Sequence, residues 1–167
     1  MIKIEYELEN QEIQETLSLL KDTPAAALDE TCFESRVRMS VGGIEMFGSL
    51  ETPRVELKGE NWSAAEAADS AWAILPILAL TGALRNQVDE LPFSGKTRFL
   101  IPGGGEIRLK RDGAEVSLES SLSGQTATCR YEELKDTLRG FASQVEKDLA
   151  RRAPELKKHP LWHTWFS

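Results

Sequence analysis

Histidine and cysteine, the side chains that carry much acid–base and metal chemistry, are scarce in this sequence. Its 167 residues contain two of each. His159 and His163 lie close to the C-terminus, so a Ser–His or Cys–His dyad would have to use a chain end, which is often poorly ordered. The G-x-S-x-G elbow of hydrolases is absent. We therefore expect that the protein is not an enzyme, although a catalytic pair of carboxylates stays open because acids are plentiful.

The two cysteines, Cys32 and Cys129, lie far apart and form no C-x-x-C motif. This spacing favours ordinary intracellular thiols, while a disulfide between them stays open as the alternative.

Long apolar runs are also missing. The longest candidate, Ala71–Leu84, contains Pro76 and Gly82 and falls short of the roughly 20 residues that cross a bilayer. The first nine residues alternate acids with apolar side chains, which is unlike a signal peptide. We expect a cytoplasmic protein without a membrane partner.

Two short motifs invite a metal or phosphate interpretation. His159-x-x-x-His163 has metal-ligand spacing, but the sequence contains no H-E-x-x-H, and catalytic zinc usually needs a third protein ligand. Residues 102–106 are rich in glycine but lack the Lys-Ser/Thr of a P-loop. We interpret the histidines as packing a terminal turn and the glycines as a hairpin turn, and we expect neither metal nor cofactor.

What the sequence does have is a concentrated negative charge. Residues 1–34 contain two of the 20 basic residues and nine of the 27 acidic ones. This segment therefore carries −7, the formal charge of the whole chain. A one-signed surface repels nucleic acid and attracts basic partners, although many proteins are acidic only for solubility.

Hydrophobic periodicity predicts the N-terminal elements. Residues 2–8 alternate apolar and charged side chains, which indicates a half-buried strand. Apolar spacing between residues 10 and 24 favours a short helix. Residues 36–50 alternate around Gly42 and Gly43, which predicts a hairpin.

The middle of the chain indicates one long helix. A short extended piece is expected at residues 55–57. The capping box Ser63–Glu66 then predicts the start of a helix over residues 64–90. Pro76 would kink this helix because it lacks an amide donor.

The C-terminal part predicts a four-stranded meander and a second helix. The strands are expected at 97–101, 106–110, 114–122 and 126–130, joined by glycine-containing turns. Apolar residues from Leu134 to Leu149 then step by four, three, four and four positions, which is typical of an amphipathic helix. The aromatic tail that follows is expected to fold back onto the core.

Together these elements predict an α+β fold. We expect a single domain, 1–167, in which an antiparallel sheet of six or seven strands has two main helices packed on one face.

Several basic residues are predicted to lie on outward strand faces or at a turn: Arg36, Arg38, Arg108, Lys110 and Arg111. Sheets that bind RNA interleave cations with aromatic side chains that stack on bases. Such aromatics are missing here, so we interpret these cations as ion-pairing with neighbouring glutamates and expect no nucleic-acid partner.

The C-terminal part resembles small bacterial immunity proteins that are encoded beside polymorphic or contact-dependent toxins. The residues that carry the resemblance are Tyr131, Glu132, Glu133, Leu134, Phe141, Val145, Leu149, Pro154, Leu156, His159, Pro160 and Trp162. The resemblance implies an intracellular inhibitor that binds a cognate toxin domain, often a nuclease. No binding residues carry over from it.

The leading hypothesis is therefore a non-enzymatic inhibitor that meets a basic toxin domain through its acidic N-terminal segment. The candidate partner-binding residues are Glu12, Glu15, Asp22, Asp29, Glu30 and Glu34. The alternative is a small ligand-binding or regulatory domain with a pocket between the sheet and the kinked helix.

The histidine pattern makes a direct prediction about metal. Dialysed protein should retain no stoichiometric zinc, and a chelator should leave its melting temperature unchanged, because His159 and His163 lack a third ligand in the sequence pattern. Metal analysis and thermal melts with and without chelator measure this. Bound zinc together with a chelator-lowered melting temperature would contradict it.

Overall fold

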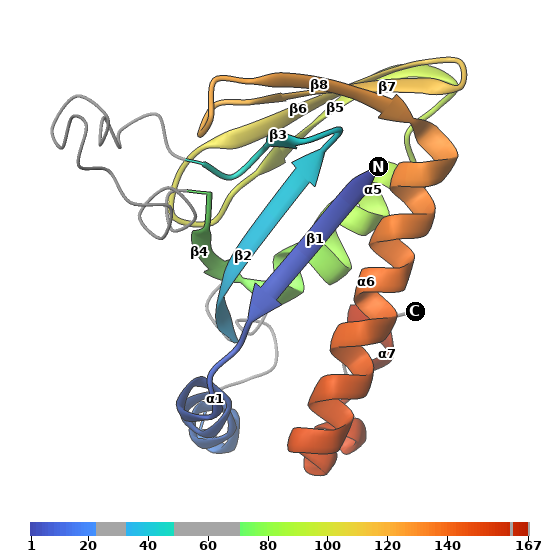
Figure 1. Ribbon diagram of the computed structural model, residues 1–167. Coiled ribbons are helices and arrows are strands. Elements are labelled where there is room, and N and C mark those ends of the chain that lie inside the picture. The colour runs from blue at the N-terminus through green and yellow to red at the C-terminus, as the bar shows by residue number, and fades with distance from the viewer. Residues whose placement is uncertain (23–32, 49–70, 161, 167) are drawn as a thin grey trace, which may run out of the picture.

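Two separate antiparallel sheets, of four strands each, form the framework of the described part of the chain. Figure 1 shows the computed structural model, which describes residues 1–22, 33–48, 71–160 and 162–166. The α+β class is confirmed, and all described strand pairs are antiparallel. The expected single sheet of six or seven strands is wrong, because the N-terminal strands pair with one another and not with the C-terminal meander.

The N-terminal sheet is centred on β2, which pairs with all three other strands. The expected hairpin is confirmed, although its return strand is short, and Gly42 and Gly43 take the positive φ angles of its turn. The strands are β1 (Ile2–Glu7), β2 (Glu34–Val41), β3 (Ile44–Glu45) and β4 (Ala73–Pro76).

The predicted long helix over residues 64–90 is wrong at residues 73–76, which form β4, whereas residues 77–89 are helical as predicted. Pro76 ends strand β4, opposite Glu34 of β2, and therefore kinks no helix. The physical reason is that proline disfavours helical backbone in the residue before it, here Leu75, and pushes that residue to extended geometry. The expected strand at 55–57 and capping box at 63–66 lie outside the described residues.

The C-terminal sheet is the meander that the sequence predicts. Its strands follow in chain order, and the glycine-rich segment at 102–105 is confirmed as the turn between the first two. The strands are β5 (Ser94–Leu100), β6 (Glu106–Asp112), β7 (Glu115–Ser120) and β8 (Thr126–Arg130).

The described helices differ in length and regularity. The two expected from periodicity, near residues 10–24 and after residue 130, are confirmed. The segment after β4 begins with a π-helix and continues as a short α-helix. The elements are α1 (Asn10–Asp22), η3 (Ala79–Leu84), α5 (Arg85–Asp89), α6 (Tyr131–Arg152), η4 (Pro154–Lys158) and α7 (Trp162–Phe166).

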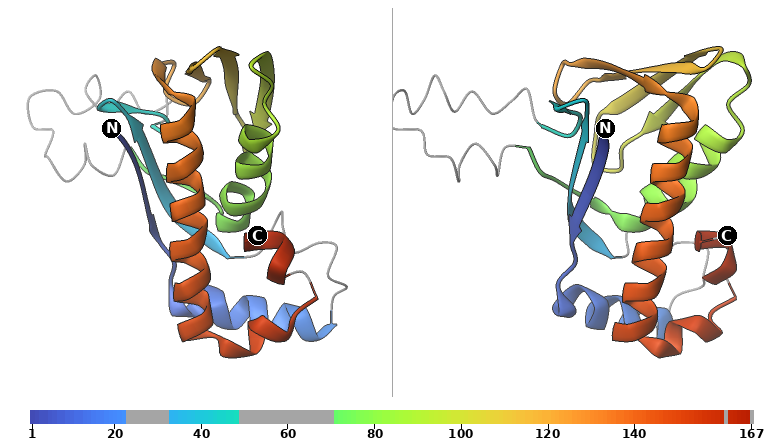
Figure 2. Two further views of the ribbon diagram at one scale, coloured as in Figure 1. Left: turned by 90° about the vertical axis from the view of Figure 1, so that its right-hand side faces the viewer. Right: turned by 45° about the vertical axis from the view of Figure 1, so that its right-hand side comes forward.

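Helix α6 joins the two sheets into one core. In Figure 2, left, α6 stands between the N-terminal sheet and the η3–α5 helices, while the C-terminal sheet closes the top. Its buried residues belong to one hydrophobic cluster that includes residues from both sheets. The expected packing of two helices on one sheet face is therefore wrong. The Tyr131 hydroxyl also donates a 2.8 Å hydrogen bond to the carbonyl of Val88, which fixes the start of α6 to α5.

The aromatic tail is folded onto this core, as the sequence predicts. Trp162, Trp165 and Phe166 are all buried. The ring of His159 stacks on Trp165, with 5.1 Å between ring centroids. Within the described ranges, we find no helix with both the length and the apolar character needed to cross a bilayer.

Burial of the tail makes a stability prediction. Trp165→Ala should lower the free energy of unfolding by about 3–5 kcal/mol, because a large aromatic leaves a cavity in a packed core. Chemical denaturation measures this. Ile74→Ala on β4 is the control: Ile74 is 71 % exposed, so its loss should change stability by about 0.5 kcal/mol or less. If Trp165→Ala lowered the free energy of unfolding no more than Ile74→Ala does, burial of the tail would not stabilise the fold.

Candidate functional site

The acids of residues 1–34 divide into paired and unpaired groups. Glu7 of β1 contacts Arg36 of β2 at 3.0 Å. Glu5 of β1 contacts Arg38 at 3.8 Å. These pairs follow directly from the β1–β2 register, which places each glutamate opposite its arginine. The predicted ion pairing is confirmed here, and these two acids are neutralised.

Four other glutamates gather around α1 and form what we call the acidic cluster: Glu9, Glu12, Glu15 and Glu34. Glu12 and Glu15 are three residues apart on α1, a spacing that makes side chains neighbours on a helix, and Glu9 lies just before its first residue. Glu34 reaches them from β2, because the Phe33 amide donates a 3.2 Å hydrogen bond to the Thr16 hydroxyl of α1.

Glu12 lies within electrostatic reach of the other three carboxylates. Partial burial raises the pKa of Glu12, and repulsion from Glu15, Glu34 and Glu9 raises it further. Within the described residues none of the four lies within ion-pair distance of a cation. The cluster therefore presents a negative potential that no cation of the described residues neutralises.

The structure brings together only part of the predicted partner-binding set. Glu12, Glu15 and Glu34 meet in the cluster. Asp22 ends α1, but its side chain lies outside the description, as do Asp29 and Glu30 entirely. Glu9 was missed by the sequence reasoning, although its spacing of three residues from Glu12 could have identified it.

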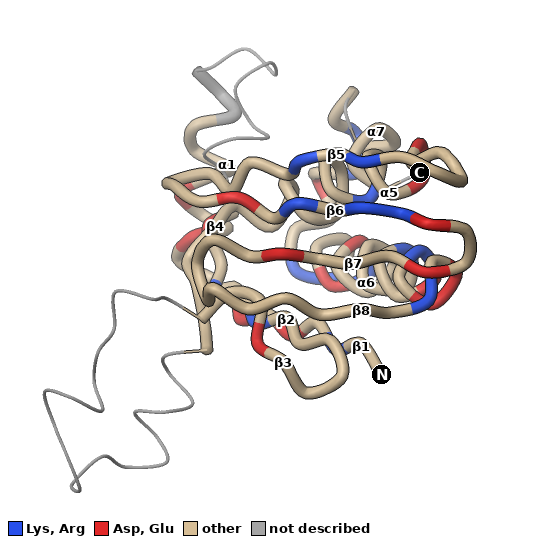
Figure 3. Tube along the Cα trace, turned by 90° about the horizontal axis from the view of Figure 1, so that it is seen from above, with Lys and Arg blue, Asp and Glu red and all other residues tan. Residues whose placement is uncertain are grey.

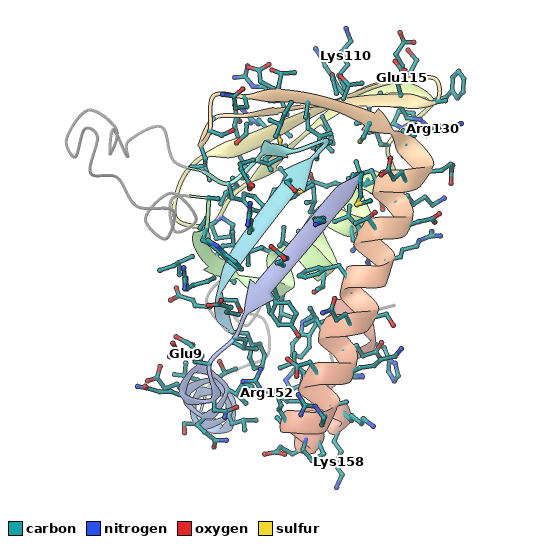
Figure 4. The ribbon with its side chains drawn as sticks, viewed as in Figure 1. Glu9, Lys110, Glu115, Arg130, Arg152 and Lys158 are labelled. Carbon is teal, nitrogen blue, oxygen red and sulfur yellow. The ribbon has the colours of Figure 1, made fainter. Side chains whose placement is uncertain are left out.

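A polar network around Asp148 fixes the start of α1 to the end of α6. The Asp148 carboxylate accepts hydrogen bonds from the Tyr6 hydroxyl at 2.7 Å, from Arg151 at 2.8 Å and from Arg152 at 3.0 Å. Arg152 also donates to the Leu8 carbonyl and the Asn10 side chain. Figure 4 shows Arg152 between α1 and α6, with Glu9 above α1. This Asp148 network holds the acidic cluster in place.

The pKa values of the network follow from these contacts. Partial burial alone would raise the pKa of Asp148, but hydrogen bonds from Tyr6, Arg151 and Arg152 outweigh it and lower the pKa. Burial raises the pKa of Tyr6, and donation to Asp148 raises it further. Both groups therefore hold their neutral-pH forms: Asp148 is ionised and Tyr6 is protonated.

The two histidines, which have metal-ligand spacing in the sequence, lie in different surroundings. His159 packs on Trp165 and His163 is exposed. In the described ranges no three histidine, cysteine or acidic side chains come close enough to share a metal ion. Cys129 is a free, half-buried thiol. Its burial, together with the nearby negative charge of Glu133, raises the pKa of the thiol to about 11. Cys32 lies outside the described residues.

The basic residues predicted on outward faces occupy two different sheets. Arg36 and Arg38 belong to β2, whereas Arg108 belongs to β6, where it pairs with Glu106 at 2.8 Å. They therefore do not share one binding face. No carboxylate of the described residues lies within ion-pair distance of Arg111. Its guanidinium lies over the Tyr131 ring and donates to the Leu91 carbonyl.

A partly enclosed pocket of about 370 Å³ lies between η3, β5 and α7. Its walls are mainly apolar, with Asn86 and Thr164 as polar groups. Gly82 of the π-helix leaves its side-chain position open. Pockets of this size and lining accommodate small molecules, and π-helices are frequent at functional sites.

The Asp148 network makes a pH prediction. Because its folded pKa is below the ordinary value of 3.8, ionised Asp148 stabilises the fold above that value, and this contribution is lost as pH falls through the folded pKa. Asp148→Asn should therefore lower the free energy of unfolding by about 1–3 kcal/mol at neutral pH. The difference from the parent protein should shrink below about pH 4.

Denaturation at several pH values measures this effect, with Asp136→Asn as the control because Asp136 is exposed on the same helix. A deficit for Asp148→Asn that stays constant across the acid range would mean that shape, and not charge, accounts for the loss.

Comparison with known proteins adds no relative. No protein-family model, curated protein or solved structure gave a significant match to the chain. The resemblance to immunity proteins therefore stays a prediction.

Proposed function

We propose that the protein is a non-enzymatic cytoplasmic inhibitor, an immunity protein, that binds and neutralises a basic toxin domain through the acidic cluster. The observation that carries this proposal is the position of Glu9, Glu12, Glu15 and Glu34 beside one another without a neutralising cation in the described residues.

Basic toxins supply the complementary surface. A nuclease holds the phosphate backbone of its substrate with lysines and arginines. Carboxylates presented on another protein occupy the same cations and compete with the substrate. Complementary charge also accelerates encounter, because the field orients the partners before contact.

The fold presents the acidic cluster on an anchored element. The Asp148 network holds the beginning of α1. Farther along the helix, the Phe33 amide donates a hydrogen bond to the Thr16 hydroxyl, and Ile13 is buried in the core. An anchored binding surface loses less conformational entropy on association than a mobile one. These contacts support α1 as the element that meets the partner.

The pocket of about 370 Å³ beside η3 favours a second candidate, a small ligand-binding or regulatory domain. It lies between the C-terminal sheet and an irregular helix, where such a domain would hold an apolar ligand bearing one polar group. Its occupant would contact Phe99, Trp165 and Asn86.

Growth rescue separates the two candidates. The protein is co-expressed with each toxin-like domain encoded in the source genome, and survival is scored against the toxin alone. Rescue by one domain, with a stable complex on gel filtration, is expected for the inhibitor. Failure with every domain, together with a melting temperature raised by a small apolar ligand, would support the ligand-binding candidate.

The acidic cluster makes a kinetic prediction for that complex. Glu12→Gln combined with Glu15→Gln should slow association by about threefold or more at low salt, while dissociation changes less, because rim charges act mainly on encounter. The effect should fade as the Debye length shortens to about 8 Å near physiological ionic strength. Association rates at two salt concentrations measure this.

The matched control is Glu132→Gln with Asp136→Asn, which removes the same charge from exposed positions of α6. Folding of both double variants should change by about 0.5 kcal/mol or less per site. Association rates equal to the parent at low salt, or slowed equally by the control, would reject steering by the acidic cluster.

A further inference from the structure

The outward face of the C-terminal sheet carries a compact block of four cations. Lys96 and Arg98 lie on β5, and Arg108 and Lys110 lie on β6; all four side chains are exposed. The register places Lys96 opposite Lys110 and Arg98 opposite Arg108. Figure 3 shows these basic positions side by side on the two strands, seen from above. We call this set the basic block.

This arrangement is unfavourable for the sheet itself. Like charges directly opposite each other across an antiparallel pair are destabilising. The N-terminal sheet has the opposite arrangement, because opposite charges face each other there: Glu5 faces Arg38 and Glu7 faces Arg36. The basic block therefore has a cost in stability that the N-terminal sheet avoids. Strand pairing accounts for Arg108, which faces Glu119 of β7, but Lys110 faces Ser117 and gains no opposed carboxylate.

Neighbouring acids compensate the block only at one end. Glu106 contacts Arg108 at 2.8 Å and Arg98 at 3.4 Å. Among the described residues, no carboxylate lies within ion-pair distance of Lys96 or Lys110. Figure 4 shows Lys110 extending away from the body of the protein.

A surface groove of about 590 Å³ lies over the block. The four cations line it, together with the hydroxyl-bearing side chains of Ser117 and Thr126 on β7 and β8, and with Glu119. Hydroxyl groups and cations are the side-chain donors that hold anionic oxygens. The groove thus combines positive charge, neutral donors and space for a small molecule.

We propose that the basic block binds a small, multiply charged oxyanion of the polyphosphate class. Side chains two residues apart on a strand are separated by about 7 Å, and adjacent strands by about 5 Å. These spacings suit a compact ligand with adjacent charged groups. The outward positions of β5–β8 hold no aromatic residue for base stacking, which disfavours single-stranded nucleic acid. This site is independent of the acidic cluster.

Calorimetric titration with sodium tripolyphosphate tests the proposal, at about 0.1 M salt so that distant charges are screened. The parent protein should bind with a one-to-one stoichiometry. Lys96→Gln combined with Lys110→Gln should weaken binding at least tenfold. Lys157→Gln with Lys158→Gln is the control: it removes the same charge from exposed positions on η4, and it should leave the affinity unchanged. Figure 4 places Lys158 at the opposite end of the molecule from Lys110.

Three outcomes would overturn the proposal. They are no heat of binding with the parent protein, equal weakening in both double variants, and tighter binding of a hexaglutamate peptide than of tripolyphosphate. The last result would assign the face to an acidic protein segment instead.

A second readout guards against misfolding of the variant. Without any anion, Lys96→Gln with Lys110→Gln should raise the melting temperature by about 1–3 °C, because it removes an opposed like-charge pair. A lower melting temperature would show that the lysines stabilise the fold, and it would overturn the proposal that the block is kept for a ligand.

Discussion

The whole structure depends on the burial of one face of α6. The apolar face of each four-stranded sheet has to be covered by another element. The helix places Leu134, Leu138 and Phe141 into the cluster where both sheets meet, while η3 and α5 close the remaining side (Figure 2). Burial of a large apolar side chain contributes about 1.5–3 kcal/mol, so these α6 residues contribute to the stability of the core that the two sheets share.

Charge is distributed around that core in three different ways. On the N-terminal sheet, opposite charges face each other and neutralise. Around α1, Glu12 is repelled by three neighbouring glutamates, and the Asp148 network holds the helix in spite of that repulsion. On the C-terminal sheet, four cations oppose one another. Like charges that lie together destabilise the fold, but they give an oppositely charged partner a strong electrostatic attraction to that surface.

Local pattern predicted the elements well where one periodicity extended over many residues, as in α6 and the meander. It failed at residues 73–76, where an apolar run suited both helix and strand and the effect of Pro76 on Leu75 decided the outcome. Periodicity also reveals which face of a strand is buried but not which strand it pairs with, so the pattern predicts one sheet where the structure has two. Likewise, the approach of Glu34 to Glu12 is a tertiary contact made through Phe33 and Thr16, and no sequence spacing encodes it.

The central claim is that the protein binds its partner through the acidic cluster on α1. Hydrogen–deuterium exchange of the free protein and of its complex with the rescuing toxin domain tests this most directly. The account predicts that slowed exchange is concentrated at α1 and at the start of β2, around Glu34. Slowed exchange confined to β5–β8, with α1 unchanged, would contradict it.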